Sequence, residues 1–186
     1  MLQGLYEGAR QDANAREHDI PLHELESRAR KARPVRSAMD ALSPRDRIHV
    51  ISEIKRKSPS KGDLASIDDP VALAREYEAG GASVISVLTE GRRFGGSLED
   101  LAAVSEAVSI PVLRKDFLET EYQIVEARAA GADLVLLIMA GITDERAERL
   151  LDVARDWGMQ ALVEAHTAEE VDRAIAIGAD IVGVNA

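Results

Sequence analysis

The chain has 186 residues, of which 46% are hydrophobic and 30% charged, and its formal net charge is -10 at pH 7. This composition is typical of one globular domain, and the acidic balance with only 3% aromatic residues argues against nucleic acid as a partner. The absence of cysteine excludes disulfides and thiolate metal sites. No N-terminal stretch resembles a signal peptide, and no apolar run reaches the roughly 18 to 20 residues of a membrane span. We therefore expect a cytoplasmic protein that does not bind membranes.

The first 47 residues carry no strand pattern and predict a helical extension. Leu22, Leu25 and Ala29 have the spacing of an apolar helix face. We expect residues 1–47 to pack against, or cap, a domain formed by residues 48–186.

A repeated glycine-alanine pair followed by a β-type run sets the architecture of the rest. It begins at Gly81, Gly131 and Gly178, at intervals of roughly 50 residues, and other strand-like runs lie about halfway between. Each unit is therefore one strand and one helix. We expect parallel strands near residues 48–54, 83–88, 111–114, 133–138, 160–164 and 180–184. Helical spacing and capping signals predict helices near residues 71–79, 98–108, 122–130, 147–157 and 171–177.

Strands rich in valine, isoleucine and leucine that alternate with helices predict a parallel sheet covered by helices. An open doubly wound sheet and a (βα)8 barrel both fit, and both bind ligands at the carboxyl ends of the strands. No strand is followed by a glycine-rich dinucleotide or Walker loop, which favours the barrel. Because only about six βα units are visible, we expect a (βα)8 TIM-barrel type fold that is incomplete here and belongs to a longer polypeptide. Its exposed sheet edges allow a monomer or a weak homo-oligomer.

Residues 53–62 place four cations and one carboxylate directly after the first predicted strand. Strand side chains alternate, so Glu53 and Lys55 share a face. Lys115 and Glu164 follow the third and fifth strands, and alternate strands of a barrel contribute to the same interior layer. We expect these four side chains to meet at the barrel mouth, where neighbouring charges suit general acid-base chemistry on a small anionic substrate. Any one of them alone is more simply interpreted as a solvated side chain, but their coincidence argues against that interpretation.

Two phenylalanines and one histidine lie near these positions. Phe94, in the loop after the second strand, could form the floor for a flat ring or fill a packing gap, and Phe117 could do either. His166 follows Glu164 on the same face, but the histidines have no metal-ligand spacing, so we expect neither a metal site nor a cofactor.

Five motifs resemble those of a known family. They are Ile51-Ser52-Glu53-Ile54-Lys55-Arg56-Lys57-Ser58-Pro59-Ser60, Leu88-Thr89-Glu90 with Phe94 in the loop that follows, Leu113-Arg114-Lys115-Asp116-Phe117, Val163-Glu164-Ala165-His166 and Val184-Asn185. Together they make essentially the whole chain resemble indole-3-glycerol-phosphate synthase of tryptophan biosynthesis. The resemblance implies a (βα)8 barrel with an N-terminal helical extension. It also implies a carbon-carbon lyase that converts 1-(2-carboxyphenylamino)-1-deoxyribulose 5-phosphate into indole-3-glycerol phosphate, with loss of carbon dioxide and water.

The resemblance also implies roles for single residues. Lys115 is similar to the family's general acid for ring closure, and Glu164 to its general base for dehydration. Lys55 is similar to the lysine near the substrate carboxylate, a position from which it could also donate a proton, and Glu53 orients hydroxyls and lysines. The remaining positions correspond to the phosphate end of the site (Ser58), its apolar walls (Phe94 and Phe117) and its polar rim (Asn185).

The family's arginine two places after Asn185, and its phosphate loops after strands seven and eight, have no counterpart in this sequence. We therefore expect this stretch of chain alone to be inactive. Two other functions stay open. A lysine at a strand exit could attack a sugar-phosphate carbonyl, as in a Schiff-base aldolase, or the chain could be a non-catalytic barrel fragment that completes its sheet with a partner.

Overall fold

The computed structural model describes residues 2–43, 47–64 and 66–185. Six strands of this part of the chain build the main sheet: β1 (Ile51–Ile54), β4 (Val84–Leu88), β5 (Val112–Lys115), β6 (Leu134–Ile138), β7 (Gln160–Ala165) and β8 (Ile181–Val184). A small hairpin pairs β2 (Lys57–Ser58) with β3 (Gly62–Asp63). The helices of the described residues are α1 (Leu2–Asp19), α2 (Leu22–Lys31), α3 (Ala38–Leu42), α4 (Pro70–Ala79), α5 (Leu98–Ala107), α6 (Glu121–Ala129), α7 (Asp144–Asp156) and α8 (Ala168–Ala176).

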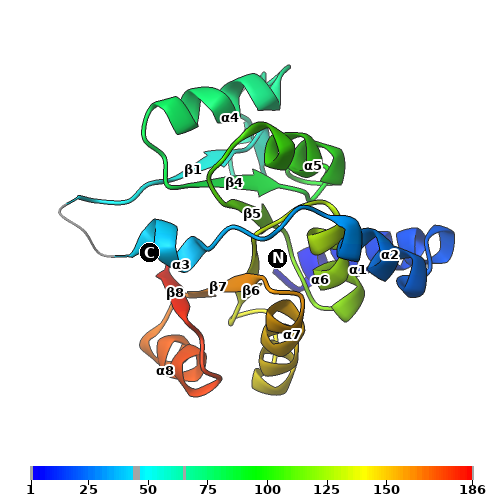
Figure 1. Ribbon diagram of the computed structural model, residues 1–186. Coiled ribbons are helices and arrows are strands. Elements are labelled where there is room, and N and C mark those ends of the chain that lie inside the picture. The colour runs from blue at the N-terminus through cyan, green and yellow to red at the C-terminus, as the bar shows by residue number, and fades with distance from the viewer. Residues whose placement is uncertain (1, 44–46, 65, 186) are drawn as a thin grey trace.

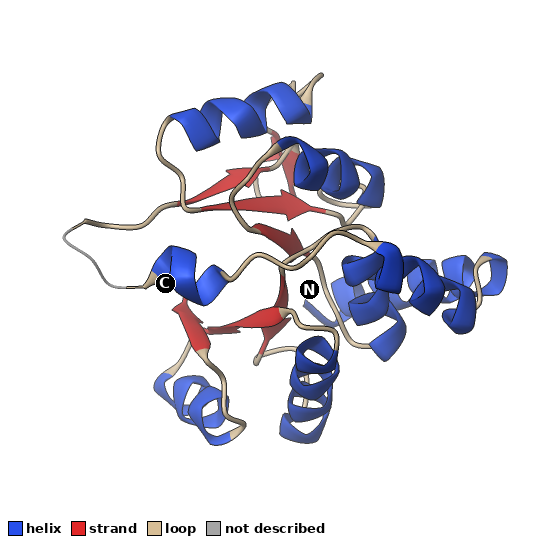
Figure 2. Ribbon diagram, viewed as in Figure 1, coloured by secondary structure: helices blue, strands red, loops and turns tan. Residues whose placement is uncertain are grey.

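The main sheet is parallel throughout, in the order β1-β4-β5-β6-β7-β8. Figure 1 shows the strands following one another along an arc, and Figure 2 shows α4 to α8 on the outer, convex side of that arc. This is the α/β fold of a partial TIM barrel, as the alternating strand and helix pattern predicts. All carboxyl ends of the strands therefore lie at one rim of the arc.

Local sequence signals explain why the helices begin and end where they do. The side chain of Asp69 accepts a hydrogen bond from the amide of Ala72, with a proline at the first helical position of α4. Thr120 forms a reciprocal capping box at α6. After α7 and α8, Gly158 and Gly178 adopt φ values of 77° and 78°, a conformation that costs glycine little and lets the chain turn into the next strand.

Several boundaries differ from the sequence prediction, most of them by one residue. α8 begins at Ala168, three residues earlier than predicted, because the side chain of Thr167 caps it. β1 begins at Ile51 rather than at residue 48, because its pairing with β4 starts with Ile51 opposite Val84. Residues 57–63 form the β2-β3 hairpin, where the sequence predicts a break in regular structure. α7 begins at Asp144, three residues earlier than predicted, because the side chain of Thr143 caps it.

The N-terminal helices contact the two ends of the sheet differently. α1 lies beside the carboxyl ends of the strands, where Tyr6 contacts the ring of Phe117 and Arg92 pairs with Asp12. α2 packs on α6 through a small apolar cluster that includes Leu25. α3 and the segment before it lie at the amino ends. None of the helices in the described ranges is long and apolar enough to cross a membrane.

Candidate active site

A cluster of one carboxylate and two ammonium groups lies at the carboxyl ends of β1 and β5. The carboxylate of Glu53 lies 2.8 Å from Nζ of Lys55 and 2.9 Å from Nζ of Lys115. The hydroxyl of Ser86, from the intervening strand β4, donates to the same carboxylate over 3.4 Å. The alternation of strand side chains and the single strand between β1 and β5 bring these groups together. Glu53 thus fixes both lysines at the rim.

The two lysines change the ionisation of Glu53. Burial alone would raise its pKa, but hydrogen bonds and charge attraction from Lys55 and Lys115 outweigh burial, so its pKa lies below the ordinary value. Glu53 is therefore an anion at neutral pH. The ammonium groups beside it are about one third exposed, so a bound substrate can reach them.

Glu164 is the fourth of the charged residues predicted to meet at the barrel mouth, and its side chain has different contacts. It lies on β7, and its Oε1 accepts a 3.0 Å hydrogen bond from the side-chain amide of Asn185 and lies 3.4 Å from Nε2 of His166. Asn185 is held in turn, because its backbone amide donates to the carbonyl of Ala165. Glu164 lines the same cavity as Lys115, while its own polar partners differ from those of Glu53.

This cavity has a volume of about 460 Å³ and a mainly apolar wall. Its ionisable lining residues are Lys115, Asp116, Glu164 and His166, and Asn185 also lines it. Phe94 and Phe117, 6.0 Å apart between ring centres, form one apolar side. The rest of the apolar lining comes from the sheet, from α1 and from the loop after β6: Leu88, Leu136, Ile138, Leu2, Leu5 and Ala140.

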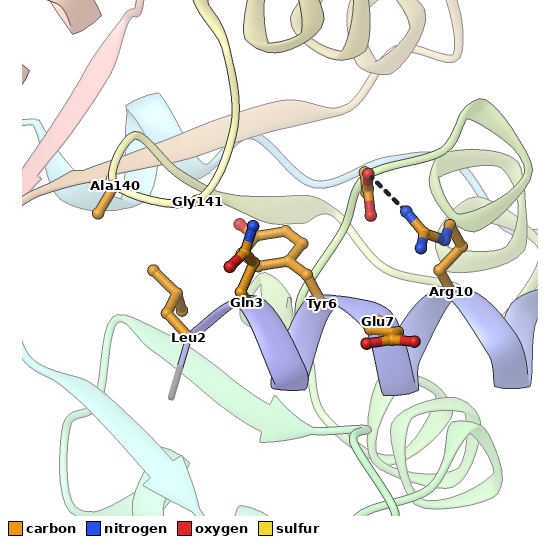
Figure 3. Close-up of a pocket in the computed structure, with 8 residues that line it drawn as sticks. Leu2, Gln3, Tyr6, Glu7, Arg10, Ala140 and Gly141 are labelled. Carbon is orange, nitrogen blue, oxygen red and sulfur yellow. Dashed lines mark hydrogen bonds and ion pairs between the residues drawn. The ribbon is translucent and has the colours of Figure 1, made fainter.

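A larger cavity of about 620 Å³ lies beside α1 and contains none of the predicted site residues. Figure 3 shows Tyr6 of α1 turned toward Gly141, with the ion pair between Arg10 and Glu119 further along the helix. Burial and the nearby carboxylate of Glu119 raise the pKa of Tyr6 well beyond its usual range, so its phenol stays neutral. The smaller cavity, by contrast, is lined by both Lys115 and Glu164.

A buried ionic network supports the cluster from behind the sheet. Arg114, which is fully buried on the helix side of β5, lies 3.1 Å from Asp116 and 2.9 Å from Glu126 of α6. Arg16 of α1 also pairs with Glu126. The residues on either side of Lys115 in the chain are thereby fixed, and α1 is tied to the same strand.

Seven of the eight predicted site residues lie at the barrel rim: Glu53, Lys55, Lys115, Glu164, Phe94, Phe117 and Asn185. Ser58 lies apart from them in β2, where its hydroxyl accepts the amide of Lys61. Of the seven, Glu53 and Lys55 do not line the 460 Å³ cavity themselves and adjoin it through the contact of Glu53 with Lys115, whereas Ser58 neither lines it nor contacts that cluster. The sequence analysis missed Leu2 and Leu5 as wall residues. Helical spacing at these positions is consistent with a helix, but it does not indicate which part of the sheet that helix covers. No group of three or more His, Asp or Glu side chains within the described ranges is arranged to hold a metal ion.

An arc of parallel strands with outer helices, and with a lysine-carboxylate cluster at the carboxyl rim, defines an enzyme of the (βα)-barrel class. The profile of the family described as indole-3-glycerol phosphate synthase matches residues 2–186. The chain therefore belongs to the indole-3-glycerol phosphate synthase family, a family of carboxy-lyases in tryptophan biosynthesis. This confirms the resemblance seen in the sequence motifs.

Several curated relatives are similar to the chain over its whole length. A protein of Leifsonia xyli subsp. xyli is 58% identical over 186 residues, which cover all of this chain and 72% of that protein. A protein of Arthrobacter sp. (strain FB24) is 57% identical, with 70% of its length covered, and one of Mycolicibacterium smegmatis is 56% identical, with 68% covered. All three are named indole-3-glycerol phosphate synthase.

Proposed function

We propose that the cavity between Lys115 and Glu164 is the site at which 1-(2-carboxyphenylamino)-1-deoxyribulose 5-phosphate closes its ring. The observation that carries this proposal is that a proton donor and a proton acceptor line one apolar cavity together with Phe94 and Phe117. An apolar cavity with a few converging polar groups suits a ligand that has one flat ring and several oxygens. The family membership supports the same substrate.

Lys115 acts as general acid in the first step. The ring carbon that bears the carboxylate forms a bond to the ketone carbon of the substrate, and the ketone oxygen takes a proton from the ammonium group of Lys115. Carbon dioxide then leaves and the ring regains its aromaticity. Glu53 orients Lys115 over 2.9 Å, while Lys55 pairs with the substrate carboxylate.

Glu164 acts as general base in the second step. The hydroxyl formed by ring closure takes a proton from the ammonium group of Lys55 and leaves as water, while Glu164 accepts the proton lost by the neighbouring carbon of the substrate. Its hydrogen bond from Asn185 aims the carboxylate at the cavity. The acid and the base come from different strands and have separate polar partners, Glu53 for Lys115 and Asn185 for Glu164.

We further propose that Ser58 meets the substrate's phosphate, because the β2-β3 hairpin directly follows the lysine-bearing exit of β1. In this proposal residues 1–47 form a helical extension to the barrel portion 48–186. The protein works in the cytoplasm as a monomer or weak homo-oligomer, needs no cofactor, and binds neither nucleic acid nor membranes.

The test is turnover of the carboxyphenylamino substrate by the full-length enzyme, followed through indole fluorescence, with a parallel incubation in borohydride. We expect indole-3-glycerol phosphate to form and Lys115 to remain unmodified. A borohydride-trapped adduct on Lys115, without ring closure, would instead identify a Schiff-base aldolase.

A further inference from the structure

We propose that Glu90 is a positioning residue that fixes Phe94 in the wall of the cavity. Glu90 lies two residues after the end of β4 and is only 4% exposed, although it is a glutamate in a loop. A carboxylate is buried at low cost only when hydrogen-bond donors surround it. The identity of those donors indicates what Glu90 does.

The donors are the backbone amides of the next loop residues. Oε1 accepts from the amide of Arg92 over 3.1 Å, and Oε2 accepts from the amides of Arg93 and Phe94 over 2.7 and 2.9 Å. Successive amides that converge on one anion form the kind of concavity that elsewhere binds phosphate or other anions. Here the chain supplies its own anion, and the loop closes around it.

The backbone of Glu90 closes the same loop a second time. Its carbonyl accepts the amide of Gly96 over 2.8 Å. A Cβ at Gly96 would lie 2.1 Å from the carbonyl oxygen of Leu88, so only glycine permits this close return of the loop to the strand. Residues 90–96 are thus a compact loop organised from its first residue.

Phe94 is where this loop meets the cavity. Its ring lines the cavity and lies 6.0 Å from that of Phe117, while its amide is bound by Glu90. Its carbonyl accepts the amide of Lys57, just beyond the exit of β1. Glu90 therefore sets the position of an aromatic wall and of the backbone next to Lys55.

The loop is also tied to α1, whose Leu2 and Leu5 line the same cavity. Nη2 of Arg92 lies 2.6 Å from the carboxylate of Asp12, and Nε of Arg92 also donates to it. Loss of the Glu90 carboxylate would release Phe94 from one side of its support while this second tie to α1 remained. We therefore expect the ring of Phe94 to shift within the cavity wall while the protein stays folded.

Amide exchange, measured residue by residue by NMR, tests the positioning without any need for turnover. In Glu90→Ala we expect the amides of Arg92, Arg93 and Phe94 to exchange on the order of 10-fold faster or more, because each loses its acceptor. Glu90→Gln keeps one oxygen with two acceptor sites, so two of the three amides should stay protected. Glu106→Gln, an exposed change on α5, is the matched control and should leave all three unchanged. Unchanged exchange in Glu90→Ala would overturn the inference.

Steady-state kinetics test whether the position matters for the substrate, and this part depends on the proposed function. We expect Glu90→Ala to raise KM roughly 10-fold with a much smaller change in kcat, because a wall residue contributes to binding more than to proton transfer. The effect should largely disappear in a Phe94→Ala background, since residues that act through one another are not additive. Additive effects would show that Glu90 acts through stability alone and would refute the positioning role. An inactive wild-type enzyme would contradict the proposed function, and the exchange data would still decide the role of Glu90.

Discussion

The two ends of the sheet each carry one carboxylate held by two basic side chains, and the two clusters differ in almost every other respect. At the carboxyl rim, Glu53 is held by Lys55 and Lys115, all three partly exposed. At the amino end, Asp133 is fully buried and is held by Arg33 and Arg36. The first cluster adjoins the 460 Å³ cavity through Lys115, whereas the carboxylate of the second has no exposed surface.

The amino-end cluster satisfies every part of its carboxylate. Asp133 accepts from the guanidinium groups of Arg33 and Arg36, from the backbone amide of Arg36 and from the amide of Val112. Arginine offers a planar fork that fits such a site, whereas lysine offers a mobile point charge that can give up a proton. Under the proposed function the lysine cluster serves chemistry while the arginine cluster stabilises the fold, which is the usual division between the two faces of a barrel.

Lys115→Met should have the largest effect, and it tests whether the lysine cluster takes part in catalysis. We expect kcat/KM to fall roughly 10²–10⁴-fold, the usual contribution of a general acid, while the melting temperature changes little. Indole fluorescence measures the first quantity and circular dichroism the second. Lys31→Met, at the exposed end of α2, is the control and should stay within a factor of about 3. Activity near that of the wild type would remove Lys115 from the mechanism.

Asp133→Ala tests the structural half. Removing one partner of a buried ion pair leaves its arginines uncompensated, so we expect the free energy of unfolding to drop by about 3–5 kcal/mol, measured with urea. Asp180 is a matched control, because it occupies the same place in the glycine-alanine repeat but is half exposed and paired with Arg155. Asp180→Ala should cost less than about 1 kcal/mol. Equal losses of unfolding free energy in Asp133→Ala and Asp180→Ala would mean that the contacts of Asp133 with Arg33 and Arg36 add no stability.

Glu164→Gln sharpens the assignment within the carboxyl rim. The amide keeps the shape and can still hydrogen-bond to Asn185, but it cannot accept the proton lost in dehydration. We expect kcat to fall roughly 10²-fold with little change in KM. Glu169→Gln, on the exposed first turn of α8, serves as the control. A large rise in KM with unchanged kcat would assign Glu164 to binding instead.

The smallest effect concerns pH. The pKa of Glu53 is lowered in the folded state, so its pairing stabilises the fold above the ordinary glutamate value of 4.5 and this stabilisation is lost as the pH falls through the lowered pKa. Glu53→Gln should therefore melt below the wild type at pH 7, with the difference shrinking below about pH 4.5. A difference that grows on acidification would show that the lysines do not hold Glu53 as an anion.

The sequence was sufficient to predict the repeating strand-helix architecture and most of the residues that lie at the carboxyl rim. Alternation within β1 predicted that Glu53 and Lys55 share a face, and the alternate-strand argument brought Lys115 to them. The β2-β3 hairpin escaped prediction because two-residue strands leave no periodicity to detect. Glu90 escaped because its burial depends on loop amides, which carry no side-chain signature.

Asp133 and Asp180 show why other roles could not be predicted. Both follow a glycine-alanine pair at the start of a strand, yet one is fully buried and the other exposed. The difference comes from Arg33 and Arg36, about 100 residues earlier in the chain. Only the folded structure shows which of two equivalent aspartates these arginines select.

The docking of residues 33–36 on Asp133 has a consequence for the order of folding. This N-terminal segment meets its carboxylate only after some 100 further residues have been synthesised. During translation its two guanidinium groups must stay hydrated and unanchored until β6 has left the ribosome. Residues 33–36 are thus synthesised well before they can dock, whereas neighbouring strands such as β6 and β7 can pair soon after they are made.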